Sequence, residues 1–570
     1  MRPTFRRFAL AALALAIPVA ASFSLPSPGH AATIVIVNND GANEGFNDPT
    51  PVAPVGGNPG TTLGAQRLFI FKHAASIWGA ILPSAITIRV AAQFNSQTCD
   101  ATSGVLGSAG SQSAHANFAG APLTNHWYHQ ALANKLSNSD LSPSDDISAT
   151  FNSDVDNSTC LGTSNWYYGL DGAEGSDIEL LPVVLHELGH GLGFSTFTSS
   201  STGGTLSGTP SAYDHFLFDE STGLHWDQMT NNNARKNSAV NTGKLTWDGA
   251  GTNRAAALYL GHEPEVHVTA PASVAGDYVA LSADFGAAAT PGGVTANLVL
   301  VNDGTAPTSD ACEPIQNGGA LAGQIAVLDR GTCTFVAKVA AAQSSGAVGV
   351  IVVNNAAGAP ITMGGTDPSI VIPAVMISQA DGTTLKNAML SATVTGTIRE
   401  SATRVAGLTA AGRMKMYAPN PVESGSSVSH FDVSATPDVL MEPAINTGLH
   451  DTVDLTHDLL VDLGWLANVT AVATTAAAPG FRVQSAPNPF HPYTVISLDL
   501  PAGGATRVAL FDIQGRLVKR LVNSWLPAGR HAVTWDGTDD QGRSAGAGVY
   551  FARVEASGVE ASQRLVKLEP

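Results

Sequence analysis

Residues 182–194 place two histidines four positions apart in an otherwise apolar stretch, with the sequence His-Glu-Leu-Gly-His at 186–190. In a helix this spacing puts His186 and His190 on one face, about 40° apart around the axis. Two imidazoles so arranged can bind a zinc ion, and Glu187 beside them can take a proton from a water molecule. Because H-E-x-x-H is short enough to arise by chance, a pair of surface histidines is the alternative.

Three glycines interrupt this stretch, at positions 189, 191 and 193. A glycine in a helix interior costs about 1 kcal/mol relative to alanine. A sequence that accepts this cost usually needs close packing or an early end to the helix. Because proline is tolerated in a first turn, the helix is expected to begin near Pro182.

The length and charge of the chain exclude some classes of protein. With 570 residues it is too long for one ordinary core, so several domains are expected. A formal net charge of −18 argues against nucleic acid or anionic membranes as partners, so the peptidase interpretation of the motif at 186–190 leaves protein or peptide substrates as the expected partners. Residues 1–32 have the basic start, apolar run and small residues of a signal peptide. Pro18 interrupts the run, which argues against a membrane anchor, and no later stretch is long and apolar enough to be a transmembrane segment.

The four cysteines of an exported chain are expected to form disulfides, and four cysteines allow three connectivities. Pairing Cys99 with Cys160 and Cys312 with Cys333 keeps each bridge within one expected domain. A cysteine metal site is disfavoured because no C-x-x-C sequence occurs.

Two further segments could bind a second ion or a substrate. The loop from Asn38 to Gly64 is rich in side-chain oxygens and could bind a structural Ca²⁺, although it lacks the spacing of an EF-hand and ordinary turns are the alternative. Residues 146–153 read as a strand that could line a cleft and pair with an extended substrate, or as an ordinary strand of a sheet.

The segment 264–399 changes to short apolar runs separated by Gly and Asn. Its Leu-Asp-Arg-Gly-Thr-Cys-Thr-Phe at 328–335, Gly-Val-Ile-Val-Val-Asn-Asn at 349–355 and Ile-Pro-Ala-Val-Met-Ile-Ser at 372–378 closely resemble a protease-associated (PA) domain. This resemblance implies an α/β domain that guides substrate or covers a cleft and has no chemistry of its own.

From Phe481 onward, apolar runs at short intervals alternate with turns rich in Gly, Pro and Asp, the pattern of an immunoglobulin-like β-sandwich. The sequences at 486–490 and 548–551 are similar to FlgD-like and C-terminal sorting modules of bacterial secreted proteins. This similarity implies contact with secretion or cell-surface machinery, and a passive spacer is the alternative.

Beyond the PA-like segment, a Ser-His-Phe sequence at 429–431 precedes Met441. Together with the motif at 186–193, these residues resemble a metzincin zinc endopeptidase of the leishmanolysin-like branch. The resemblance implies that His430 is the third zinc ligand, that Met441 forms a Met-turn beneath the metal, and that the PA domain is an insertion. An uninterrupted metzincin would have histidine at position 196, where this chain has Thr196.

His430 follows His190 by 240 residues, so only a folded insertion with neighbouring ends could bring them together. The other candidates for the third ligand are His215, His225, His262, His267, His450, Glu263 and Glu265. A carboxylate ligand would make the enzyme a gluzincin-type peptidase.

The sequence therefore predicts an α+β multidomain protein that acts as a secreted zinc endopeptidase with one catalytic Zn²⁺. A noncatalytic surface-binding or adhesion protein on a peptidase scaffold is the alternative. The expected divisions are a signal peptide at 1–32, a metzincin-like metallopeptidase domain at 33–263 and 400–467, a PA insertion at 264–399, a linker at 468–480 and an all-β sandwich at 481–570.

Overall fold

The computed structural model describes residues 31–446, 448–465 and most of 482–568. The gaps in the last range are 487, 491–493, 501–503, 513–515, 527–528, 536, 540–542 and 557–558. Residues 1–30 of the expected signal peptide and the expected linker at 468–480 lie outside the described residues. In the part of the chain that is described, no helix is long and apolar enough to cross a membrane.

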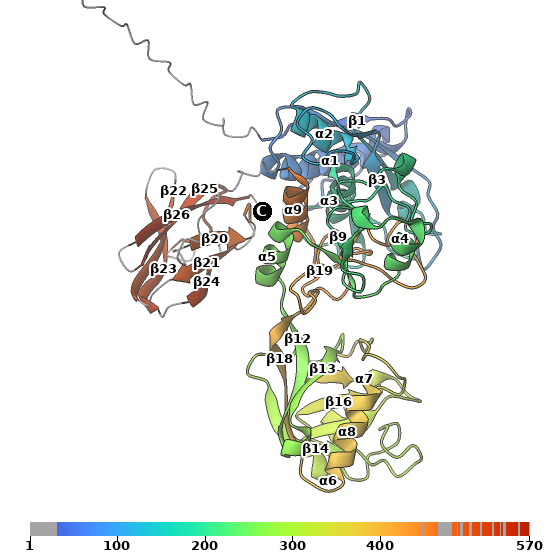
Figure 1. The fold of residues 1–570 in the computed structure, drawn as a ribbon, viewed down its shortest axis with the longest axis vertical. Helices are drawn as coiled ribbons and strands as arrows, with labels where there is room; N and C mark the ends of the chain where they lie inside the picture. Colours follow the sequence, from blue (N-terminus) through green and yellow to red (C-terminus); the bar gives the residue numbers. More distant parts are fainter. Residues whose placement is uncertain are drawn as a thin grey trace, which may run out of the picture.

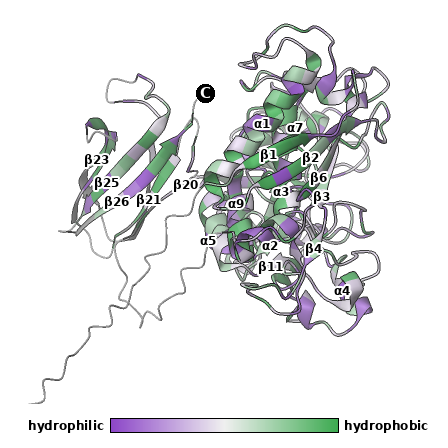
Figure 2. Ribbon diagram, turned by 90° about the horizontal axis from the view of Figure 1, so that it is seen from above, coloured by the Kyte–Doolittle hydropathy of each residue, from purple (hydrophilic) through white to green (hydrophobic). Residues whose placement is uncertain are grey.

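The N-terminal part is built on a four-stranded sheet in the order β1-β2-β6-β3 (Figure 2). Its strands are β1 (Ile34–Asn38), β2 (Ile88–Asn95), β6 (Ile147–Asn152) and β3 (Gly107–Ser111). The first three are parallel, and β3 pairs with β6 in the antiparallel sense. β6, at the residues 146–153 considered for pairing with a substrate, is therefore an internal strand, as in the alternative of an ordinary sheet strand. The strand at this end of the described sheet is β3.

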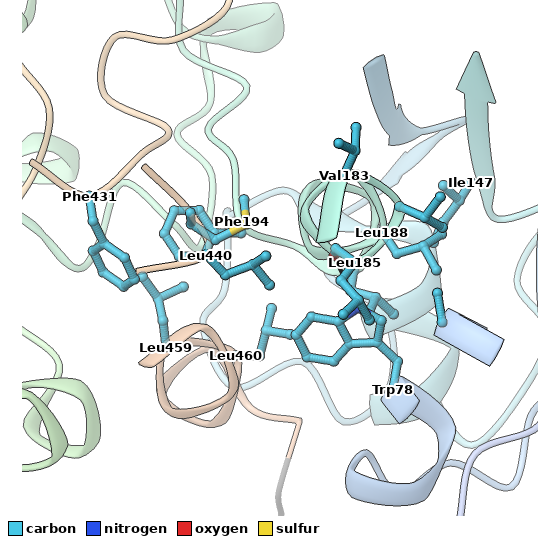
Figure 3. Packing of buried hydrophobic residues seen from close by; sticks show 14 of the residues in the cluster. Trp78, Ile147, Val183, Leu185, Leu188, Phe194, Phe431, Leu440, Leu459 and Leu460 are labelled. Atoms are coloured by element: carbon cyan, nitrogen blue, oxygen red, sulfur yellow. Dashed lines mark hydrogen bonds between the residues drawn. The ribbon is translucent and has the colours of Figure 1, made fainter. Parts of the chain in front are cut away.

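Helices α1 (Leu63–Ile81) and α3 (Leu180–Leu192) pack against this sheet and against each other. The Thr62 side chain caps α1 by accepting the backbone N–H of Ala65, which sets the start of the helix. The indole N–H of Trp78 in α1 donates to the carbonyl of Leu185 in α3 at 3.1 Å. Figure 3 shows Leu185 beside Trp78 and Leu188 beside Ile147.

α3 carries His186 and His190 and is buried on every side. This explains its glycines, because each lies where a side chain would collide or where the helix ends. A Cβ on Gly189 would lie 3.1 Å from Met441 Sδ, and one on Gly191 would lie 2.8 Å from Ile147 Cδ1. Gly193, with a φ of 135°, ends the helix.

Replacing Gly191 by Ala is expected to lower the free energy of unfolding by about 1–3 kcal/mol, although Gly→Ala normally stabilises a helix. The added methyl group would overlap the branched, buried side chain of Ile147, which has no room to move. Thermal or denaturant unfolding of the metal-free chain measures the change. Gly189→Ala is the matched control, with a smaller expected loss because the neighbouring methionine is flexible. Equal losses in the two variants would contradict this explanation.

Smaller elements surround the core of the N-terminal part. They are the paired strands β4 (Ala114–His115) with β5 (Tyr128–His129) and β7 (Trp166–Tyr167) with β8 (Ile178–Glu179), and the helices α2 (Gln130–Ser137) and α4 (Asn232–Ser238).

A second sheet joins chain segments from before and after the expected insertion. Its order is β10-β9-β11-β19, with β10 (Leu224–His225), β9 (Leu217–Asp219), β11 (Leu245–Trp247) and β19 (Met414–Lys415). β19 pairs with β11, and Met416 then bridges to Phe431. Helices α5 (Ala250–Tyr259) and α9 (Asp454–Leu463) also pack together across the same division. Segments on the two sides of the insertion thus form one core.

The chain between these segments closes into a seven-stranded barrel, joined to the rest through β12 and β18 (Figure 1). The strands are β12 (His262–Ala270), β13 (Gly276–Ser282), β17 (Ala374–Ile377), β16 (Gly349–Val353), β15 (Ile325–Asp329), β14 (Val294–Leu300) and β18 (Thr395–Val405). Its helices are α6 (Gly318–Leu321), α7 (Phe335–Ser344) and α8 (Gln379–Met389). His262 pairs with Val405, so the two ends of the barrel are neighbours.

The described C-terminal residues form two antiparallel sheets that share one hydrophobic core. One sheet contains β20 (Arg482–Ala486), β21 (Thr494–Leu500) and β24 (Gly529–Trp535). The other contains β23 (Leu517–Leu526), β22 (Gly504–Asp512), β25 (Gly548–Ala556) and β26 (Val559–Lys567). This is the predicted all-β sandwich.

Each disulfide joins two cysteines of the same structural unit, and the pairing is the one expected from the sequence. Cys99–Cys160 lies in the N-terminal part and Cys312–Cys333 in the barrel.

Candidate metal centre

Three histidines meet in the buried core that the segments before and after the barrel form together. Nε2 of His186 lies 3.1 Å from Nε2 of His190 and 3.1 Å from Nε2 of His430. His186 and His190 come from adjacent turns of α3, and His430 comes from the segment after the barrel. The pairing of β11 with β19 and the bridge between Met416 and Phe431 bring this segment to the helix.

Backbone carbonyls hold the other nitrogen of each ring. Nδ1–H of His186 donates to Leu440 O at 2.7 Å, that of His190 to Phe194 O at 2.8 Å, and that of His430 to Ser426 O at 2.7 Å. A neutral imidazole that donates through Nδ1 carries its lone pair on Nε2. The three lone pairs therefore converge on one point.

Burial keeps the three rings neutral. It lowers the pKa of His186 to about 3 and that of His190 to about 4. Burial, together with the two neighbouring imidazoles, holds the pKa of His430 well below its ordinary value. Neutral imidazole is the form that binds metal.

A divalent metal ion fits this arrangement. Nε2 of His186 lies 3.1 Å from Nε2 of both His190 and His430, and none of the three nitrogens carries a hydrogen to donate. The lone pairs at these distances repel one another. Tetrahedral zinc with Zn–N bonds of about 2.0–2.1 Å separates its nitrogen ligands by about 3.3 Å. The cluster has three histidines and no carboxylate, which is the donor set for one ion with an open coordination position.

Glu187 lies beside the three histidines, against the edge strand β3. Its Cγ would be 3.2 Å from a Cβ on Gly107, and its carboxylate accepts the backbone N–H of Ala109. Burial raises the pKa of Glu187 to about 8. The bond from Ala109 was not foreseen from the sequence, since nothing in residues 107–111 distinguishes this strand as a partner of the motif.

A chain of hydrogen bonds through Leu440 to Asp454 fixes the orientation of His186. Leu440 accepts the Nδ1–H of His186 through its carbonyl, and its own N–H donates to Asp454 Oδ2 at 2.6 Å. The next residue, Met441, is fully buried and its sulfur lies under Gly189. Asp454 was not among the site residues expected from the sequence, so its role as a positioning residue was missed.

Thr196, where histidine would follow in an uninterrupted motif, has a structural role. Its hydroxyl donates to Asp214 Oδ1 at 2.5 Å, and Thr198 donates to Asp214 Oδ2 at 2.6 Å. The Thr196 N–H also donates to Ser429 Oγ at 3.3 Å, next to His430. The loop after α3 is therefore tied to the segment that supplies the third histidine.

The other candidate ligands lie elsewhere, and all but one contact an oppositely charged side chain or pair a histidine with a carboxylate. His215 contacts Asp227, His225 contacts Asp248, His267 contacts Asp277, His450 contacts Glu179, Glu263 contacts Arg404 and Glu265 contacts Arg399, while His262 is exposed on β12. Only His430 of the set joins His186 and His190.

Internal hydrogen bonds occupy the loop that was considered for calcium. Asp40 accepts the backbone N–H groups of Phe46 and Phe94, and Glu44 accepts that of Gly41. The loop supplies none of the residue clusters that could hold a metal among the described residues. Its oxygens thus serve turn formation, and the expectation of calcium there finds no support.

Two protein-family models match parts of the chain. One, described as a PA domain, matches residues 294–385 in the barrel, and one described as an FlgD Ig-like domain matches residues 494–559 in the sandwich. These matches confirm the two resemblances that the sequence showed for these segments. No curated protein matches the chain.

Several solved structures are similar to parts of the chain. A zinc aminopeptidase from Bacillus subtilis is 25% identical over 27% of this chain and 35% of its own, with a TM-score of 0.19. An aminopeptidase from Aneurinibacillus sp. strain AM-1 is 26% identical over 27% and 38%, with a TM-score of 0.18. A Peptidase M28 precursor from Shewanella amazonensis is 16% identical over 33% and 46%, with a TM-score of 0.20. The chain spans less than half the length of each, and TM-scores this low define no common fold.

The comparisons contradict the assignment to the metzincins. The peptidases named above are two aminopeptidases and a Peptidase M28 precursor, and the two matching family models, of a PA domain and an FlgD Ig-like domain, lie outside the residues of the motif. The assignment rested on a few short motifs, which fix the local placement of ligands and not the fold around them. The chain is therefore not assigned to the metzincins.

Proposed function

We propose that this protein is a zinc-dependent peptidase in which His186, His190 and His430 hold one catalytic Zn²⁺ and Glu187 is the general base. The convergence of three Nε2 lone pairs, each directed by a backbone carbonyl behind the ring, carries this proposal. Glu187 lies beside the point where the three Nε2 atoms converge, although metal binding alone does not require this carboxylate. The presence of Glu187 therefore argues against the alternative of a noncatalytic binding protein.

The residues of the site divide the work of hydrolysis. Zinc bound there would supply a Lewis acid that polarises the scissile carbonyl and makes water easier to deprotonate. Glu187 takes the proton of the attacking water and later gives it to the leaving amine. The N–H of Ala109 orients its carboxylate. No covalent intermediate with the chain is required.

The edge strand β3 offers a place for the substrate. It ends the described sheet, and Glu187 packs directly against it, so an extended peptide paired with β3 would pass the three histidines. Binding along a strand holds a chain on both sides of the scissile bond and favours endopeptidase activity. The similarity to aminopeptidases makes removal of N-terminal residues the second candidate.

Paired substrates distinguish the two modes. We expect the mature chain to cleave an internally quenched peptide with an acetylated N-terminus, to lose this activity with a chelator and to regain it with zinc. Hydrolysis of aminoacyl nitroanilides with no cleavage of the acetylated peptide would make it an aminopeptidase. Failure to cleave either substrate in the zinc-loaded chain would overturn the peptidase proposal.

We also propose that the protein is exported and works outside the cell or at its surface. Two disulfides form most readily in an oxidising compartment, and the FlgD-like sandwich is suited to contact secretion or surface machinery. In this proposal the barrel is an insertion within one peptidase domain that guides protein or peptide substrates.

A further inference from the structure

A second cluster of metal-binding side chains lies at the start of α3. Glu174, Glu179 and His450 each place a ligand atom within 4.8 Å of the other two. Glu179 directly precedes α3, Glu174 lies in the loop before β8, and His450 lies between Met441 and α9. Glu179 precedes His186 by seven residues, or about 10 Å along a helix, so this cluster is separate from the three histidines.

Two carboxylate oxygens in the cluster lack partners. Oε1 of Glu179 and Oε2 of Glu174 are buried and accept no hydrogen bond from any described residue. The Glu179 side chain is only 4% exposed, and its other oxygen lies 2.6 Å from Nδ1 of His450. A buried carboxylate oxygen without a partner is unfavourable unless a cation compensates it.

The charge around the cluster is unbalanced. Burial raises the pKa of Glu179, and the negative charges of Glu174 and Asp451 raise it further, while His450 lowers it. Three carboxylates thus face one imidazole, which can carry at most one positive charge. The surroundings favour a further cation.

We propose that Glu174, Glu179 and His450 bind a second divalent metal ion of the zinc type. A histidine nitrogen with carboxylate oxygens suits Zn²⁺, whereas Ca²⁺ requires six to eight oxygen ligands. The imidazole packs closely against Gly172, where a Cβ would lie 2.9 Å from Cε1 of His450. The exposed part of His450 gives the ion a path from solvent. The ion links the loop before β8 and the segment before α9 to the start of the helix that carries His186 and His190.

Another cluster of histidine and carboxylate side chains has the opposite charge balance. His126 and His215 both contact Oδ2 of Asp227, at 3.3 and 2.7 Å. Two imidazoles there meet one carboxylate, and the hydrogen bond to Asp227 raises the pKa of His126. Oδ1 of Asp227 is also buried without a partner, so the cluster at His450 is distinguished by its excess of carboxylates and not by unpartnered oxygens alone.

Elemental analysis of the full mature chain tests the proposal. The chain is stripped with a chelator, reloaded with zinc and passed through a weakly chelating column. We expect two zinc ions per chain in the parent, one in Glu174→Gln, one in His190→Ala and none in the double variant. Glu400→Gln, a glutamate replaced in the barrel, is the control and should keep two. Equal zinc content in Glu174→Gln and the parent would overturn the proposal.

The design separates this ion from the catalytic one. If the peptidase proposal failed and this one held, the parent would bind one ion that Glu174→Gln loses and His190→Ala keeps. A second measurement requires no change at the cluster: zinc should raise the melting temperature of stripped His190→Ala by several degrees. An unchanged melting temperature would count against the site even if Glu174→Gln folded poorly.

Discussion

Glu187→Gln is expected to lower kcat for peptide hydrolysis by about 10³-fold while zinc content stays at the parent level. Proton transfer by a positioned side chain contributes about 10²–10⁴-fold to catalysis, and glutamine cannot accept the proton of the attacking water. The replacement has nearly the same shape, and its carbonyl oxygen can still accept the N–H of Ala109. Packing against β3 should therefore be preserved, and the loss should appear in kcat.

The measurement is kcat and KM on the quenched peptide, with zinc per chain determined on the same samples. Glu400→Gln, on strand β18 of the barrel, is the matched control with the same chemical change and should retain parent activity. Activity of Glu187→Gln within tenfold of the parent would remove Glu187 from the mechanism. A loss of zinc together with activity would show that the side chain supports the metal site instead.

His430→Ala is expected to weaken zinc binding at the catalytic site by more than about 100-fold and to abolish hydrolysis. Replacing even an outer-shell partner of a metal ligand costs about 10–100-fold in affinity, and His430 would be one of only three protein ligands. The variant also leaves the carbonyl of Ser426 without the Nδ1–H of the ring. Two nitrogens from adjacent turns of α3 then remain.

Zinc titration against a competing chelator measures the change in affinity. His262→Ala is the control, because this histidine is exposed on the barrel strand β12 and was a candidate for the third ligand. It should leave zinc affinity and activity unaltered. Zinc and activity that survive in His430→Ala would require another third ligand and would overturn the proposed site.

Much of the local structure could be predicted from the sequence because it depends on neighbouring residues. The helix of the His-Glu-Leu-Gly-His motif was expected to begin near Pro182, and α3 begins at Leu180. The apolar runs and turns after Phe481 predicted a β-sandwich, and the sequence of the barrel matched a known domain closely enough to be identified. Helix starts also depend on single capping residues, as in α1, where Thr62 sets the start.

The metzincin assignment was wrong because a short motif does not specify the fold around it. A motif of a few residues reports how side chains are spaced on one helix or turn, and such spacing recurs wherever zinc must be held. The order of strands around the site and the identity of the domains attached to it are separate properties. A short motif does not determine those properties.

The sequence by itself determined that His186 and His190 share one face of a short helix with Glu187 beside them, because helical periodicity requires only adjacent residues. Only the tertiary structure decided which third residue meets them. His430 reaches His186 across 244 residues because the barrel begins and ends at paired strands and β19 returns to β11. The carbonyl of Leu440 behind His186, the N–H that holds Glu187 and the second cluster at Glu179 likewise arise from segments far apart in the chain. Sequence spacing does not encode such contacts, since they depend on how separate elements pack.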